Sequence, residues 1–168
     1  MNSEVILKTN RLVIRKFNFD DAAFIIQLMN TPGWLQFIGD RNVKTVDDAK
    51  NYLISGPLKS YEENGFGLWM VELINSKTSI GMCGLLKRET LEDIDIGYAL
   101  LPEYVGQGYA FEMAEATLLY AKNQLNIKKV VAITDENNVN SIALLHKLGL
   151  RFDRKIEHAD KTNTHLYS

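Results

Sequence analysis

The sequence has few of the residues that build disulfide-linked or metal-held folds. Its 168 residues include one cysteine, Cys83, and three histidines. A single cysteine cannot form an internal disulfide or a cysteine-based zinc ribbon, and it is typical of a reducing compartment. His146 adjoins Lys147 in an expected helix, whereas His158 and His165 lie near the C-terminus. Their spacing matches no metal-ligand pattern, so we expect no metal.

Long apolar runs and a surplus of basic residues are absent as well. The longest uncharged stretch, residues 22–39, is interrupted by Pro32 and Gly33, so we expect no membrane span and no membrane partner. Nineteen Lys and Arg oppose twenty-one Asp and Glu, and neither half of the chain is basic. Nucleic acid is therefore not an expected partner. Residues 1–8 do not resemble a secretory signal, which predicts a cytoplasmic protein.

Length and composition favour one folded unit. Apolar residues make up 46% of the chain and charged residues 24%. A chain of this size buries roughly 70% of its unfolded surface, so it needs no disulfide or metal for a stable core. We expect a single domain over residues 1–168.

The pattern of apolar residues predicts an α+β fold. Expected strands cover residues 11–15, 66–73, 79–87, 92–101, 129–134, 152–157 and 164–167. Expected helices cover residues 20–29, 46–57, 106–124 and 138–148, and a further helical turn is expected before Gly65. Thr45 and Asp48 have capping-box spacing, and the segment 31–33 should end the first helix. The strand, helix and strand over residues 92–134 predict a crossover between parallel neighbours.

Gly106-Gln107-Gly108 lies between an expected strand and the first turn of a helix. Glycines allow close approach to an anion, and a helix N-terminus favours negative charge, so a diphosphate could bind here. The glycines could equally serve only the geometry of the turn. A dinucleotide-binding fold would need a third glycine where Phe111 stands, which disfavours a nucleotide-dependent oxidoreductase. A Walker loop is excluded because no Gly-Lys-Ser/Thr follows.

Several separated segments of the sequence resemble the GNAT superfamily of N-acetyltransferases, in particular the branch of ribosomal-protein N-terminal acetyltransferases. The resemblance is strongest at residues 101–110, Leu-Pro-Glu-Tyr-Val-Gly-Gln-Gly-Tyr-Ala. It extends over residues 7–15, 80–85, 95–98, 138–141 and 147–149. It implies a mixed, mostly antiparallel sheet with a splayed parallel strand pair and flanking helices.

The resemblance also implies where acetyl-CoA, the co-substrate, would bind. The main chain of Tyr98, Ala99 and Leu100 should pair with pantetheine as an added strand. The diphosphate should bind the amides of Val105, Gly106, Gln107, Gly108, Tyr109 and Ala110. Asn138 could reach the cofactor or only cap its helix. Glu103 stands where the family often has Gln or Arg, and we expect it to point to solvent.

Acetyl transfer to an amine needs a base, and Asp95 resembles an acidic position often seen in the family. Asp93 shares the face of Asp95, because strand side chains repeat every two residues. The alternative is that both carboxylates solvate a sheet edge. Leu145 replaces the usual tyrosine acid of the family, and Ser141 is the candidate to protonate the thiolate. Ser141 could instead be a second capping hydroxyl.

The expected function is acetyl transfer from acetyl-CoA to an amine acceptor, a protein N-terminus or a small molecule, in a ternary complex. One alternative is a module that binds CoA or acyl-CoA without catalysis. A rival mechanism would acetylate Cys83, although its strand context argues for burial. Trp34, Phe37 and Trp69 could line an acceptor pocket or belong to the core. The acidic run at Glu89, Glu92, Asp93 and Asp95 could attract a cationic amine or be solvated. The oligomeric state stays open.

Overall fold

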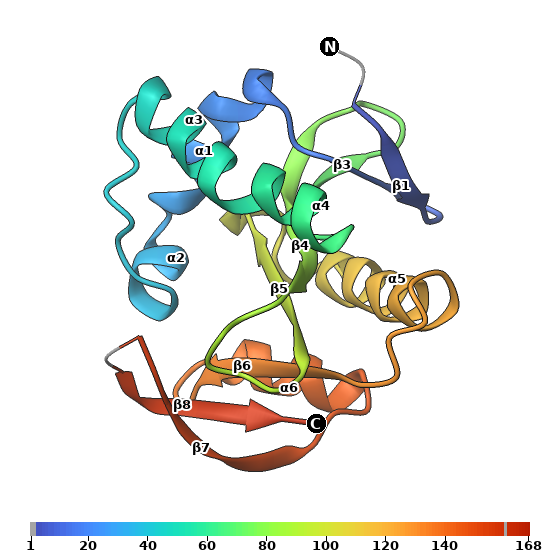
Figure 1. Ribbon diagram of the computed structural model, residues 1–168. Coiled ribbons are helices and arrows are strands. Elements are labelled where there is room, and N and C mark those ends of the chain that lie inside the picture. The colour runs from blue at the N-terminus through green and yellow to red at the C-terminus, as the bar shows by residue number, and fades with distance from the viewer. Residues whose placement is uncertain (1–2, 160) are drawn as a thin grey trace.

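The computed structural model describes residues 3–159 and 161–168, which form one eight-stranded sheet (Figure 1). The strands are β1 Val5–Lys8, β2 Leu12–Arg15, β3 Leu68–Leu73, β4 Ser79–Leu86, β5 Ile94–Leu100, β6 Val130–Asp135, β7 Phe152–His158 and β8 Lys161–Tyr167. Their order is β1-β2-β3-β4-β5-β6-β8-β7, and β5 with β6 is the parallel pair among these described strands. The predicted α+β class and mostly antiparallel sheet are therefore confirmed.

Helices connect the strands at the expected points. They are η1 Phe19–Asp21, α1 Ala22–Met29, α2 Pro32–Phe37, α3 Val46–Leu53, η2 Ile54–Leu58, α4 Lys59–Asn64, η3 Pro102–Tyr104, α5 Tyr109–Asn123 and α6 Val139–Lys147. Thr45 caps α3, since its hydroxyl accepts from the Asp48 N–H at 3.1 Å and the Asp48 carboxylate accepts from the Thr45 N–H at 2.8 Å. In the described part of the chain, no helix has both the length and the apolar character that a bilayer crossing requires.

The helices differ from the prediction near two prolines. The segment 31–33 ends α1, as predicted, but Pro32 also begins the helix α2, which was not predicted. Proline fits the first helical position, where no N–H bond is needed. Pro57 does not end the helical run that starts at Val46. The chain widens there into the π-helical turn η2 and continues into α4, and such a turn accommodates the missing proline N–H. The strand β1 was not predicted from the sequence.

Helices cover both faces of the sheet, so it has two apolar cores. On one face α5 and α6 pack on Trp69, Cys83 and Leu85. On the other face α1, α2 and α3 pack on Met70 and Met82. Figure 1 shows α1 and α2 on one side of β4 and β5 and α5 on the other. The neighbours along β3 and β4 thus point to opposite helical layers, as the period of two requires.

Strand β4 lies unusually close to its neighbours because of two glycines. A Cβ at Gly84 would overlap the carbonyl oxygen of Gly67, and one at Gly81 would overlap the carbonyl oxygen of Ala99. Larger residues would push the strands apart at the middle of the sheet. Gly81 thus allows β5 to lie close to β4, and β5 is the strand from which the site below is built.

Candidate active site

The parallel strands β5 and β6 pair only at their beginnings. The register joins Ile94 to Val130 and Asp95 to Val131, and no later pair follows between them in the described chain. Beyond this point β6 pairs with β8 on its other side, while β5 remains paired with β4. Figure 1 shows the two strands diverging. The β6-facing edge of residues 96–100 therefore lacks a strand partner, which leaves main-chain groups free for a ligand.

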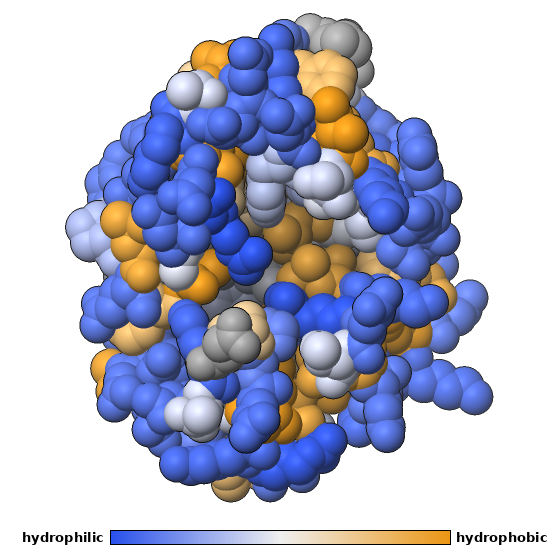
Figure 2. Space-filling model, turned by 60° about the vertical axis from the view of Figure 1, so that its left-hand side comes forward, coloured by the Kyte–Doolittle hydropathy of each residue, from blue (hydrophilic) through white to orange (hydrophobic). Residues whose placement is uncertain are grey.

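A cavity of about 1380 Å³ extends into this opening. It is lined by the free end of β5, the turn before α5, the start of α6 and residues of α2, η2 and α4. Figure 2 shows the corresponding face hollowed near its centre, with hydrophobic atoms deep inside and hydrophilic ones around the rim. The volume exceeds the roughly 300–1,000 Å³ of single-ligand pockets, so two substrates can share the cavity.

The turn before α5 presents a row of N–H groups. Gly106 and Gly108 have φ of +81° and +82°, a left-handed conformation that favours glycine. In the described chain the N–H groups of residues 106–111 donate to no protein acceptor. The Val105 N–H already donates to the Pro102 carbonyl at 3.2 Å, so the free donors begin one residue later than expected. A helix N-terminus with unused donors is a ready anion site.

Arg11 holds the shape of this turn from outside. Its guanidinium donates to the Gln107 carbonyl at 3.0 Å and to the Glu112 carboxylate at 2.6 Å, and it lies over the Tyr109 ring. Glu112 also accepts from the Thr9 hydroxyl at 2.6 Å. Partial burial works against the ionised form, yet the hydrogen bonds from Thr9 and Arg11 lower the pKa of Glu112. Arg11 thus binds a carbonyl of the turn and does not involve its N–H groups.

Two hydroxyl groups meet across the opening. The Tyr98 hydroxyl from β5 lies 2.8 Å from the Ser141 hydroxyl in the first turn of α6. Burial raises the pKa of Tyr98 to about 12, so its hydroxyl keeps its proton at neutral pH. Asn138 caps α6, with its side-chain oxygen accepting from the Ser141 N–H at 3.2 Å. The capping interpretation of Asn138 is thus correct, whereas the Ser141 hydroxyl bonds to Tyr98.

Asp95 lies at the base of the opening and is only 1% exposed. Its Oδ1 accepts from Arg88 at 2.9 Å, while Oδ2 has no hydrogen-bond partner among the described residues. Burial raises the pKa of Asp95, against the opposing effect of Arg88. Asp93 points elsewhere and pairs with Lys129 at 2.7 Å, outside the cavity. The interpretation that Asp95 merely solvates a sheet edge is therefore wrong.

The two residues that depart from the expected family pattern, Leu145 and Glu103, do not line the cavity. Leu145, at the position where the family resemblance implies a tyrosine, is fully buried in the core. Glu103 is exposed and does not line the cavity, as expected. Of the four carboxylates in the acidic run, Asp95 alone lines the cavity, so the run does not surround its mouth.

Of the three aromatic candidates, Trp34 and Phe37 line the cavity. Trp69 instead belongs to the core, where it meets the Tyr120 ring edge-on at 5.7 Å. Sequence reasoning missed Arg41, Arg88 and Lys161, which also line the cavity and come from three distant segments. No local spacing connects them.

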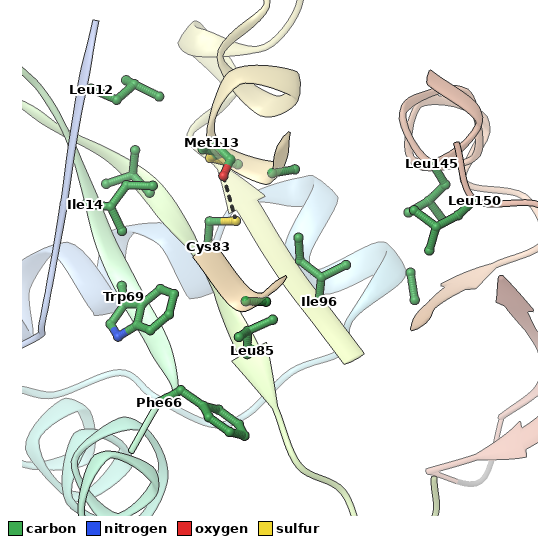
Figure 3. Packing of buried hydrophobic residues seen from close by; sticks show 14 of the residues in the cluster. Leu12, Ile14, Phe66, Trp69, Cys83, Leu85, Ile96, Met113, Leu145 and Leu150 are labelled. Atoms are coloured by element: carbon green, nitrogen blue, oxygen red, sulfur yellow. Dashed lines mark hydrogen bonds between the residues drawn. The ribbon is translucent and has the colours of Figure 1, made fainter. Parts of the chain in front are cut away.

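Cys83 lies in the core and not at the cavity. Figure 3 shows its sulfur pointing toward the Met113 carbonyl, at 3.7 Å, among the side chains that α5 covers. The sulfur also lies 3.3 Å from the Thr117 hydroxyl. Burial raises the pKa of the Cys83 thiol to about 12. The expected burial is therefore confirmed, and a buried, protonated thiol is a poor nucleophile. Among the described residues no cluster of three or more His, Cys, Asp or Glu side chains could hold a metal.

A mixed sheet that opens between two parallel strands, beside free N–H groups at a helix N-terminus, can bind an extended ligand that carries a diphosphate. The acetyltransferase (GNAT) domain model matches residues 11–151, and the chain belongs to this family. Acetyl transfer is the general reaction of the family, with acetyl-CoA as co-substrate.

Individual relatives agree with this assignment. The uncharacterized N-acetyltransferase YnaD of Bacillus subtilis is 27% identical over 86% of this chain and 82% of its own. A GNAT-family acetyltransferase from Bacillus anthracis is 25% identical, with a TM-score of 0.78 over 96% of this chain and 95% of that one. The ribosomal-protein-S5-alanine acetyltransferase of Vibrio fischeri, at 19% identity and a TM-score of 0.78, covers 96% and 93% of the two chains and shares the fold.

The burial of Cys83 predicts that its thiol resists labelling and is not needed for acetyl transfer. We expect native Cys83 to resist thiol reagents at about pH 8, because its thiol is buried and its pKa lies far above the roughly 8.5 of a free thiol. The Cys83→Ala variant should keep its acetyl-transfer rate within about twofold, since it removes no cavity group. Labelling kinetics and steady-state assays check both points. Rapid labelling of the native protein, with loss of turnover, would support the covalent route instead.

Proposed function

We propose that the protein transfers the acetyl group of acetyl-CoA directly to a primary amine, on a protein N-terminus or a small molecule, in a ternary complex. The observation that carries the proposal is one cavity bordered both by an unpaired strand edge and by a row of free N–H groups. Pantetheine amides suit the first and a diphosphate suits the second. The Vibrio fischeri relative is named for an alanine acceptor, which supports an amine.

The chain's own groups would hold acetyl-CoA in three ways. Main-chain groups of Tyr98, Ala99 and Leu100 would pair with the pantetheine amides. The free N–H groups from Gly106 to Ala110 would bind the diphosphate. The side-chain oxygen of Asn138 is used in capping, so its amide nitrogen is the group free to donate to the cofactor.

Asp95 is the proposed base. Its Oδ2 carries no hydrogen bond from a described residue, so this oxygen is available to take a proton from the acceptor ammonium, directly or through a water. A pKa raised by burial makes the carboxylate a stronger base than an ordinary aspartate. Arg88 holds the other oxygen and fixes the orientation of the carboxylate.

Ser141 is the proposed acid. As the amine nitrogen bonds to the acetyl carbon and the carbon–sulfur bond breaks, Ser141 would give its proton to the leaving thiolate. The Tyr98 hydroxyl would orient Ser141 through their hydrogen bond, and a water would return the proton to the Ser141 oxygen. A free N–H of β5 would stabilise the negative charge on the thioester oxygen. Thiols ionise near pH 8.5, so the leaving group needs only modest help.

Turnover with simple amines tests the proposal. We expect CoA release from acetyl-CoA to depend on an added amine, in a panel of N-terminal peptides, polyamines and aminoglycosides, with an acetylated product by mass spectrometry. Gly108→Ala should weaken CoA binding about tenfold, because it strains a left-handed residue at the diphosphate seat. Gly65→Ala, equally left-handed but outside the cavity, is the matched control. Tight CoA binding without turnover on any amine would favour the non-catalytic module.

The two catalytic roles predict different pH–rate profiles. In the wild type, kcat/KM should fall as the pH drops through the raised pKa of Asp95, because the protonated carboxyl cannot accept a proton. Asp95→Asn should lose this fall and lower kcat/KM about a hundredfold. Ser141→Ala should keep the fall and lower kcat about tenfold, since a thiolate is already a fair leaving group.

Asp93→Asn is the matched control for this prediction, because Asp93 directly precedes β5 and pairs with Lys129 outside the cavity. It should keep the wild-type profile and rate. CoA affinity, measured by calorimetry, should stay unchanged in all three variants. An Asp95→Asn enzyme with the wild-type profile would remove Asp95 as the base.

A further inference from the structure

The cavity is more positively charged than the chain that forms it. Six Lys and Arg side chains line it against three carboxylates, whereas the whole chain has a net charge of −2. Five of these cations come from the residues after α2, from α4, from the residues after β4 and from the start of β8. This part of the cavity, which we call the cationic end, is lined by Arg41, Lys59, Lys87, Arg88 and Lys161.

The carboxylates at the cationic end are already neutralised. Glu63 lies 3.7 Å from the Lys59 ammonium, and Asp95 pairs with Arg88. Arg41 has no hydrogen bond or ion pair with any described residue. Because both carboxylates are matched, the charge of the remaining cations is left without a counterion in the described chain.

Lys161 is fixed at this end by neutral groups. Its ammonium donates to the carbonyls of Phe37 and Ile38, at 3.0 and 3.3 Å. These contacts tie the start of β8 to the end of α2, and within the described residues the carbonyls leave the positive charge of Lys161 without a counterion. Lys161 is therefore a cation held by two hydrogen bonds, whereas Arg41 is exposed.

Three of these cations lower the pKa of the same histidine, His158. The Arg88 guanidinium lies 3.5 Å from its imidazole. Burial lowers the pKa of His158, and Arg88, Arg41 and Lys161 lower it further. Three cations thus act on one ring, which stays neutral at neutral pH and adds no charge of its own. The positive field at this end comes from several side chains that converge.

We propose that the amine acceptor carries an anionic group, a carboxylate or a phosphate, that binds Arg41 and Lys161 at the cationic end while its amine faces Asp95. This inference rests on the proposed function and names the class of acceptor. An anionic group would supply the missing counterion, and a guanidinium binds carboxylate and phosphate in a bidentate manner. A polycationic amine would instead meet uncompensated positive charge.

Matched acceptors that differ only in the charge of one group test the inference. The peptide arm uses the amides Ala-Glu-NH₂, Ala-Gln-NH₂ and Ala-Lys-NH₂, and the small-molecule arm uses phosphoethanolamine against ethanolamine. Both kcat/KM and calorimetric binding to the enzyme–CoA complex are measured. The variants are Arg41→Gln, Arg41→Lys and the control Lys122→Gln, which removes an exposed charge outside the cavity.

We expect the wild type to prefer the acidic probe of at least one arm, with Ala-Glu-NH₂ about tenfold above Ala-Lys-NH₂ or phosphoethanolamine about tenfold above ethanolamine. Arg41→Gln should remove most of this preference, while Arg41→Lys and Lys122→Gln should keep it. High salt should reduce it, because the charges are partly exposed. A preference in only one arm supports the inference and tells a peptide from a small molecule.

The outcomes separate this inference from the proposed function. Acetylation without a preference for acidic probes, or with a preference for Ala-Lys-NH₂, overturns the inference and leaves acetyl transfer standing. Tighter binding of acidic probes without any acetylation supports the inference and contradicts acetyl transfer. A preference that survives in Arg41→Gln, or the failure of every probe both to bind and to react, overturns the inference.

Discussion

The short pairing between β5 and β6 is the constraint on which the rest of the site depends. A sheet normally satisfies its main-chain groups with the next strand, but here the register stops at Asp95 and Val131. Pairing with β4 holds β5 in position on one side, and pairing with β8 holds β6 on the other. The opening is therefore a fixed feature of the sheet, and its free groups can pair with an extended ligand without any unfolding.

The same opening explains how groups from distant segments come together. The turn before α5 follows directly from β5, and α6 follows from β6, so both helix N-termini face the space between the strands. Tyr98 and Ser141 meet there because each belongs to one side of the opening. Asp95, at the last paired position, marks its closed end and borders the cavity as a buried carboxylate. The divergence of β5 and β6 thus explains both the opening in the sheet and the grouping of these side chains.

Much of this arrangement could be predicted from the sequence, because it depends on local patterns. The alternating residues of β5, the apolar stripe of α5 and the Gly106–Gly108 turn are contiguous, and they predict a crossover with an anion seat. The helix that begins at Pro32 was missed, because proline both ends one helix and suits the start of another. The cationic end could not be predicted. Arg41, Arg88 and Lys161 are separated by dozens of residues, and only the tertiary fold unites them.

Residue-resolved amide hydrogen exchange, with and without CoA, tests most directly whether the open edge of β5 is the cofactor site. The account predicts that CoA slows exchange within residues 98–100 and over residues 106–111, whose N–H groups have no protein acceptor in the described chain. Slower exchange at the edge strand β7 or on α1 alone, with those two segments unchanged, would contradict it.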